Sequence, residues 1–238
     1  IVFYSPGKLA WAETTGGGVK FTTDDDVSLD VHPLGAKIAS TVFNRKVHFC
    51  SLALPPYSFN GSAWEPTKSP ALASLAPAYV TAIQRRMVVA GIPGRETEIH
   101  LSRVDNEGVF PEDEDAAESS VLRAGYINIA NILGTADQIT GIASFEQNRL
   151  VVFTADRSFV YQIDPSINNW QLDERANINI GTISHNSIAH AGTDLLFCSR
   201  NGVHSVVRSE DNGILVYSQS MSDKVELTYR EMLAGVDD

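Results

Sequence analysis

The sequence predicts an all-β protein made of β-propeller-like antiparallel meanders, about four to five blades that need not form a closed set, with one short C-terminal helix. Three observations predict it. A strand-turn-strand unit recurs along the 238 residues, turn signals separate short apolar strands, and no amphipathic run of helical length lies between those strands. We treat residues 1–238 as a single propeller-like domain. The strand-like start at Ile1 indicates a part of a longer polypeptide.

The recurring unit is an apolar strand that stops at a polar pair and runs directly into a second apolar strand. Residues 38–45 read IASTVFNR and residues 142–149 read IASFEQNR, which agree at five of eight positions. Looser copies end at Arg86 and Thr193, so the intervals between equivalent positions are 41, 63 and 44 residues. Two of the three fit a four-stranded propeller blade, and the long one indicates an insertion. The residues that define the repeat, and whose arginines we expect to hydrogen-bond from one repeat to the next, are Asn44, Arg45, Arg86, Asn148 and Arg149.

Turns then return each second strand into a third. Asn201 and Gly202 separate two apolar runs, and Asn-Gly in that context is a strong hairpin signal. Residues 155–158 and 92–96 are expected to make the same return in earlier repeats. Consecutive hairpins of this kind are typical of antiparallel meanders rather than of βαβ units.

Two segments depart from this pattern. Apolar residues spaced to form one helical face follow Ser222, which can serve as the N-cap, and end before Gly235. Residues 105–120, inside the long interval, are too polar to enter a blade, and we expect this insertion loop to leave the propeller and return. It carries a run of four carboxylates, expected at a rim or in a lumen unless it is an ordinary solvated run: Glu112, Asp113, Glu114 and Asp115.

The charge balance disfavours a protein that grips nucleic acid. Lys and Arg number 18 against 29 Asp and Glu, which gives a net charge of −11. Affinity for DNA comes largely from Lys and Arg that displace counterions from phosphates, so the sign is opposite to that of a DNA-binding surface. An anionic membrane is disfavoured for the same reason, whereas repelling DNA from a surface is compatible with this charge.

Motifs for catalysis, cofactors and metals are missing from the sequence, and we predict no catalytic, cofactor-binding or metal-binding residue. Cys50 and Cys198 fall at equivalent repeat positions and are expected to be buried free thiols. His185 and His190 would face opposite sides of a strand, which argues against joint metal binding. Residues 24–26 are three adjacent aspartates without the spacing of a calcium loop, typical of a solvated turn.

Two stretches resemble the central region of short-tailed phage tail nozzle proteins, the tubular protein B-like or packaged-DNA stabilisation family. Residues 138–154 carry the glycine and the RLVVFT strand of that pattern, and residues 180–203 carry its Ile-Gly turn and Phe-x-Ser hairpin. Residues 86–91 and 99–102 look like the preceding blade, so the clearest similarity spans about 80–210.

The resemblance implies a structural role rather than a chemical one. It implies a non-enzymatic subunit of a homohexameric ring in the virion tail, assembled in the host cytoplasm below portal and adaptor proteins, that retains packaged DNA and conducts it during ejection. DNA would pass through the lumen without sequence-specific binding, and no membrane is involved. The alternative is a β-propeller module that binds or hydrolyses a ligand such as a glycan, which should present carboxylates and aromatic side chains converging at one place.

Overall fold

The protein is built from small antiparallel sheets that follow one another along the chain. The computed structural model describes residues 37–51, 54–60, 64–66, 76–113, 120–133, 137–173 and 179–206, the strand residues 2–5, 8–15, 18–23, 210–211 and 214–215, and Thr228 and Glu231. Within these ranges every strand pairs with its neighbour in sequence, and every pairing is antiparallel.

Four meanders, here called blades 1 to 4, form the body of the protein. Blade 1 contains β4 (Ala39–Phe43), β5 (Lys46–Ser51), β6 (Leu54–Phe59) and β7 (Trp64–Pro66). Blade 2 contains β8 (Tyr79–Ile83), β9 (Arg86–Ile92), β10 (Arg95–Leu101) and β11 (Gly125–Asn128). Blade 3 contains β12 (Ile139–Phe145), β13 (Arg149–Thr154), β14 (Ser158–Gln162) and β15 (Gln171–Leu172). Blade 4 contains β16 (Ala189–Ala191), β17 (Asp194–Ser199) and β18 (Gly202–Ser205).

The remaining elements are short. A separate three-stranded sheet contains β1 (Val2–Ser5), β2 (Lys8–Thr15) and β3 (Gly18–Thr23), and a last hairpin joins β19 (Glu210–Asp211) to β20 (Ile214–Leu215). One helical turn, α2 (Ala130–Leu133), precedes blade 3, and the 3-10 turns are η1 (Ile167–Asn169) and η3 (His185–Ser187).

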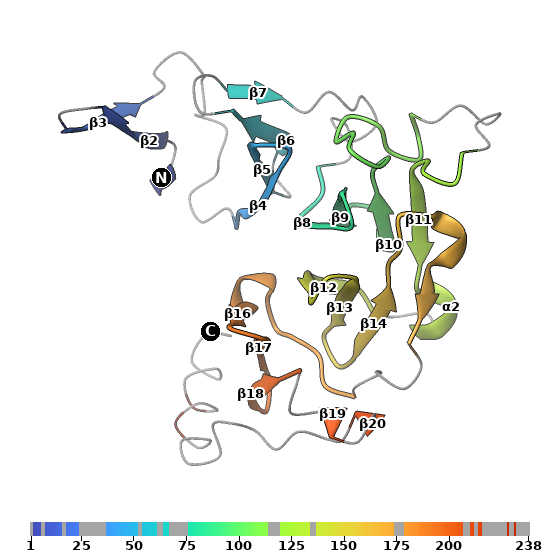
Figure 1. Cartoon of the computed structure of the whole chain (residues 1–238). Helices are drawn as coiled ribbons and strands as arrows, with labels where there is room; N and C mark the ends of the chain where they lie inside the picture. The colour runs from blue at the N-terminus through green and yellow to red at the C-terminus, as the bar shows by residue number, and fades with distance from the viewer. Residues whose placement is uncertain are drawn as a thin grey trace.

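The four blades lie around an arc, with the first strand of each toward the middle (Figure 1). Strands β4, β8 and β12 lie next to each other, as the first strands of successive propeller blades do. The predicted all-β, propeller-like fold is therefore confirmed. The hairpin predicted at Asn201–Gly202 joins β17 to β18. The predicted C-terminal helix after Ser222 lies outside the described residues, apart from Thr228 and Glu231.

The first turn of each blade explains the sequence repeat and corrects its register. Asn44 and Arg45 have φ angles of 48° and 62°, and Gln84 and Arg85 have nearly the same pair, 47° and 61°. Two consecutive positive φ angles are the mark of a tight hairpin turn whose twist matches that of the strands. The residue equivalent to Arg45 is therefore Arg85, and the predicted equivalence with Arg86 is wrong by one position.

A difference in turn length caused this error. In blade 1 Phe43 pairs with Lys46 across a two-residue turn, whereas in blade 3 Phe145 pairs with Arg149 across a three-residue turn. Arg149 is thus the first residue of its second strand, the position held by Arg86 in blade 2 and Lys46 in blade 1. Aligning Arg45 with Arg149 therefore concealed the extra residue in the turn of blade 3.

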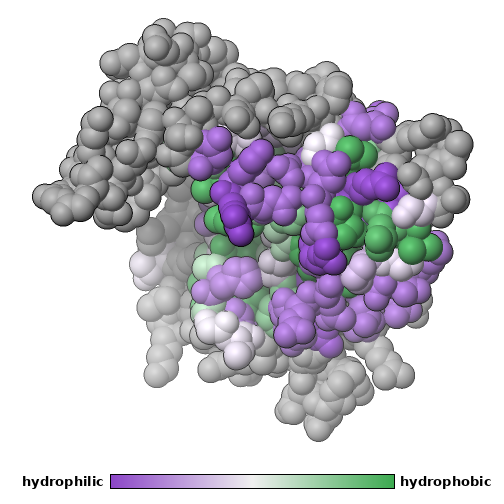
Figure 2. Space-filling model, turned by 45° about the horizontal axis from the view of Figure 1, so that its top comes forward, coloured by the Kyte–Doolittle hydropathy of each residue, from purple (hydrophilic) through white to green (hydrophobic). Residues whose placement is uncertain are grey.

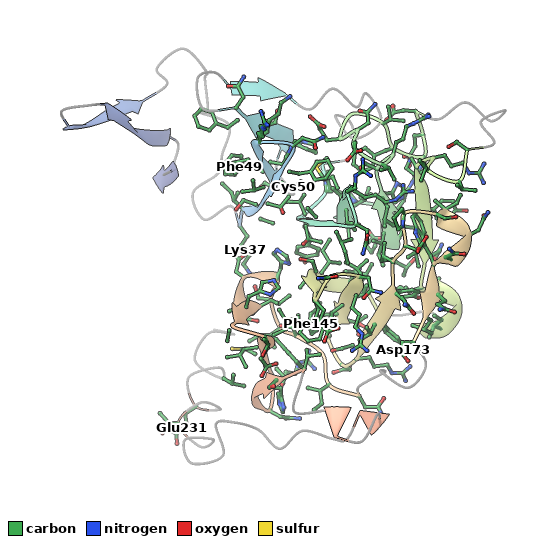
Figure 3. All side chains as sticks on the ribbon, viewed as in Figure 1. Lys37, Phe49, Cys50, Phe145, Asp173 and Glu231 are labelled. Atoms are coloured by element: carbon green, nitrogen blue, oxygen red, sulfur yellow. The ribbon has the colours of Figure 1, made fainter. Side chains whose placement is uncertain are left out.

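Buried side chains fill the spaces between neighbouring blades. The cluster between blades 1 and 2 contains Ala39, Phe43, Cys50, Val80, Met87, Val89 and Phe110. Blades 2 and 3 share a larger cluster that includes Val88, Ile99, Leu101, Ile142, Leu150, Val152 and Phe159. Blades 3 and 4 share one that includes Phe145, Val151, Phe153, Leu195 and Phe197. Figure 3 shows these side chains between the sheets, with Cys50 and Phe145 labelled. Each blade is therefore stabilised by burial against the next one.

No helix in the described part of the chain is long and apolar enough to cross a membrane.

Candidate functional site

The first half of the insertion between β10 and β11 folds back onto blade 2 instead of leaving it. We call residues 103–113 the strap. The Arg103 N–H donates to the carbonyl of Val109 at 2.9 Å, and the Asp105 N–H donates to the carbonyl of Arg85 at 2.8 Å. Phe110, in the middle of this polar stretch, is fully buried in the core between blades 1 and 2. No strand of a blade lies within residues 103–113, but the expectation that the chain leaves the propeller at the insertion is wrong for this half.

The strap also contacts the first turn of blade 1. Glu107 lies 3.4 Å from the Lys46 ammonium and accepts a 2.6 Å hydrogen bond from the Asn44 side chain, which also donates to the Asp105 carbonyl at 3.2 Å. Burial works to raise the pKa of Glu107, but the hydrogen bonds from Asn44 and the backbone, together with Lys46, outweigh it and lower the pKa. The strap therefore joins two blades through an ionised carboxylate.

At its far end, the strap covers a buried imidazole. His100 on β10 is 1% exposed, its Nε2 lies 2.9 Å from a Glu98 carboxylate oxygen, and its Nδ1 lies 3.1 Å from an oxygen of Glu112. Arg95 pairs with Glu112 from the same strand, and the Tyr126 ring lies 6.0 Å from the His100 ring. Each ring nitrogen of His100 thus lies within hydrogen-bond distance of a carboxylate oxygen.

The predicted acidic run is thus divided. Glu112 contacts His100 and Arg95, while Asp113 accepts a 3.0 Å hydrogen bond from the Phe110 N–H and donates its own N–H to the Phe110 carbonyl. Glu114 and Asp115 lie outside the described residues. Sequence reasoning missed Glu98 and His100. The two residues are two positions apart on a strand, so their side chains lie on the same face, and this spacing could have predicted that they are neighbours.

Arg86 makes the repeat-to-repeat contact predicted for it. Its fully buried guanidinium donates to the backbone carbonyls of Ser102 and Arg123 at 2.6 and 2.7 Å, and to that of Pro165 in blade 3 at 2.6 Å. It also lies 5.1 Å from the centre of the Trp170 ring. Blades 2 and 3 are therefore joined through one charged side chain.

The other repeat-defining residues behave differently. Arg149 pairs with Glu146 in its own turn at 3.6 Å, the Asn148 carbonyl accepts the Ile163 N–H at 2.7 Å, and Arg45 is exposed. Further contacts between blades come from Asn44, the residue before Arg45, and from its equivalent in blade 2, Gln84. Asn44 bonds to the strap, and the Gln84 side chain donates to the Gln147 carbonyl of blade 3 at 2.9 Å.

The cysteine and metal expectations have mixed outcomes. Cys50 is buried, and burial raises the pKa of its thiol, but Cys198 is only partly buried, which corrects the prediction of two buried thiols. Residues 24–26 lie outside the described residues. In the described part of the chain no three His, Cys, Asp or Glu side chains are grouped so that they could hold a metal ion.

His185 gives a pH-dependent prediction. Its Nδ1 accepts the Ile142 N–H at 3.4 Å, its ring lies 5.0 Å from that of Tyr79, and burial lowers its pKa from 6.5 to about 4. The unfolded chain therefore binds a proton first as the pH falls, and up to about 3 kcal/mol of folding stability is lost between pH 6.5 and 4. Urea unfolding at several pH values should show a smaller loss for His185→Asn than for the exposed control His190→Asn. An equal loss of folding stability with falling pH in both variants would contradict this. Burial also lowers the pKa of His48, which therefore contributes to the loss of stability in both variants.

The chain matches no protein-family model and no curated protein sequence. Among solved structures it is similar to BamB from Moraxella catarrhalis, at 12% identity over 84% of this chain and 51% of that one, with a TM-score of 0.44. It is also similar to Raptor from Chaetomium thermophilum, at 15% identity over 84% and 18%, TM-score 0.45, and to the computationally designed Ika4 protein, at 12% identity over 72% and 91%, TM-score 0.40. The chain thus spans about half or less of the two natural proteins. At these scores the function has to be argued from this chain's own residues.

Proposed function

We propose that the chain is a non-enzymatic structural subunit of a phage tail nozzle, one copy of a homohexameric ring that retains packaged DNA and conducts it during ejection. Its partners would be further copies of itself, the portal and adaptor proteins and other tail proteins, and its location the virion tail. The proposal begins from the resemblance of residues 138–154 and 180–203 to that family. These residues form β12 and β13 of blade 3, and η3 to β18 of blade 4.

One observation carries the proposal: five basic side chains of the blades lie beside carboxylates of the protein itself. Phosphate binding requires Lys and Arg that can displace counterions, and a cation already paired with a carboxylate is less available for this. A wall of this kind, with a net charge of −11, lets DNA slide without adhesion. Figure 2 shows hydrophilic residues over most of the described surface on one face. Basic residues with a side-chain nitrogen no more than 3.9 Å from a carboxylate oxygen include Lys46, Arg85, Arg95, Arg149 and Arg200.

Releasing two of these cations should create DNA affinity. Arg85 pairs with Asp105 and Arg200 with Asp156, and all four side chains are about half exposed or more. We expect the double variant Asp105→Asn, Asp156→Asn to bind duplex DNA at least about tenfold more tightly than the wild type in low salt, with the gain lost as salt is raised. Fluorescence anisotropy of labelled DNA measures this.

The control variant removes the same amount of charge without releasing a cation. Glu96 and Asp137 accept hydrogen bonds from the backbone N–H groups of Gly94 and Gln138, so Glu96→Gln with Asp137→Asn changes only the net charge. This control should bind DNA as weakly as the wild type. Tight binding of DNA by the wild-type chain at physiological salt would contradict the proposal.

The alternative function is favoured by one arrangement. Glu98, Glu112 and the exposed ring of Tyr126 converge around His100, and carboxylates beside an aromatic ring are what a glycan-binding or hydrolytic propeller would present. Both carboxylates are already engaged by His100, which is why we place this function second. Saturable binding of a soluble oligosaccharide that is lost in Glu98→Gln would reverse the order.

A further inference from the structure

Strand β11 is the outer edge of blade 2, and half of its backbone groups face away from the sheet. The Ile129 N–H donates to the Thr97 carbonyl at 3.0 Å, so this pair is hydrogen-bonded in the β10–β11 ladder. Pairs alternate in an antiparallel ladder, which makes Tyr126 and Asn128 members of the non-hydrogen-bonded pairs. Their N–H and C=O groups therefore point outward, and among the described residues no strand pairs with them.

Exposed hydrophobic side chains lie on this strand and in the segments on either side of it. In the described part of the chain six large hydrophobic side chains are strongly exposed, and four of them lie between residues 121 and 132: Val121, Leu122, Tyr126 and Ile132. Tyr126, in the middle of β11, is 59% exposed. An edge strand flanked by exposed apolar side chains is a surface on which another strand can be added.

The two faces of β11 differ in chemistry. Tyr126 lies on the face of His100, where the carboxylates of Glu98 and Glu112 are each about one-fifth exposed. The opposite face is apolar, because Ile127 and Trp170 pack against the core shared by blades 2 and 3. Trp170 lies so close beneath Gly125 that an added Cβ would be 2.9 Å from its ring.

From this geometry we propose that β11 is a docking edge for an extended segment of another protein, in which Lys or Arg alternates with apolar residues. The cationic side chains of the added strand stack on the Tyr126 ring and meet Glu98 and Glu112, while its apolar side chains continue the surface of Ile127 and Trp170. Glu98 and Glu112 outnumber Arg95, the arginine that lies beside both, which favours a basic strand, and the net charge of −11 disfavours a second copy of this chain. The inference depends on β11 alone and not on the ring proposed above.

A synthetic peptide of alternating Lys and Val tests the docking edge. We expect it to bind the wild-type chain and to protect the Tyr126 and Asn128 amides from hydrogen exchange. An alternating Glu and Val peptide should not bind. Tyr126→Pro removes an outward N–H at an edge position where proline is tolerated, and it should weaken binding about tenfold, whereas Tyr126→Phe should leave binding unchanged.

Several results would overturn the proposal. Binding of the Lys and Val peptide without protection of the two amides would mean non-specific attraction to an acidic protein, and the wild-type chain alone suffices to show this. Equal binding by Tyr126→Pro, with its fold checked by circular dichroism, would have the same meaning. Self-association of the wild type that Tyr126→Pro abolishes would identify a second copy as the occupant.

Discussion

Replacing Arg86 by methionine should destabilise the protein by about 3–5 kcal/mol, a large part of the stability of an ordinary domain. Methionine fills much of the same space but donates no hydrogen bond. The carbonyls of Ser102, Arg123 and Pro165 would then lose these donors, and the hydrogen bond that Arg86 makes from blade 2 to blade 3 would be lost. Urea unfolding followed by circular dichroism measures the change in the free energy of unfolding.

The adjacent arginine is the matched control. The Arg85 side chain is 68% exposed and pairs with Asp105 at the surface, so Arg85→Met should lower the free energy of unfolding far less than Arg86→Met. Arg86→Lys should fall between the two, because a single ammonium retains the charge but cannot replace the planar fork of the guanidinium. If Arg86→Met costs no more than Arg85→Met, the buried arginine does not hold the blades together.

The second large effect is expected at Phe110. Phe110→Ala would open a cavity between blades 1 and 2 and should cost about 3–5 kcal/mol. Since Phe110 is the apolar anchor of the strap, the backbone amides of residues 103–113 should also exchange with solvent much faster in the variant. Hydrogen exchange read by mass spectrometry, together with urea unfolding, measures both effects.

Leu122→Ala is the control for Phe110. Leu122 lies in the same insertion but is 41% exposed, and its truncation should change stability by no more than about 0.5 kcal/mol. A Phe110→Ala protein as stable as Leu122→Ala, or one whose strap amides exchange at the wild-type rate, would show that the strap does not depend on this side chain.

The sequence predicted the features of the fold that repeat or that depend on neighbouring residues. Meanders, the Asn201–Gly202 hairpin and the contact of Arg86 with another repeat follow from strand periodicity, turn chemistry and internal similarity. The register error arose because a three-residue turn before Arg149 and a two-residue turn before Lys46 leave arginines at different positions of the unit.

The strap could not be predicted because its partners are distant in the sequence. Its carboxylates look like a solvated run, yet Glu107 is held by Asn44 and Lys46 of blade 1, and Glu112 by His100. Polar residues enter a packed region when other side chains satisfy them, and a single polar stretch does not reveal those partners.

Sedimentation velocity of the purified chain, alone and mixed with candidate portal and adaptor proteins, tests the central claim most directly. A ring subunit should assemble into one closed species of six copies, by itself or on its neighbours, and electron microscopy of that species should show an axial channel. A chain that stays monomeric in every mixture, at concentrations where the blades are folded, would contradict the proposed nozzle.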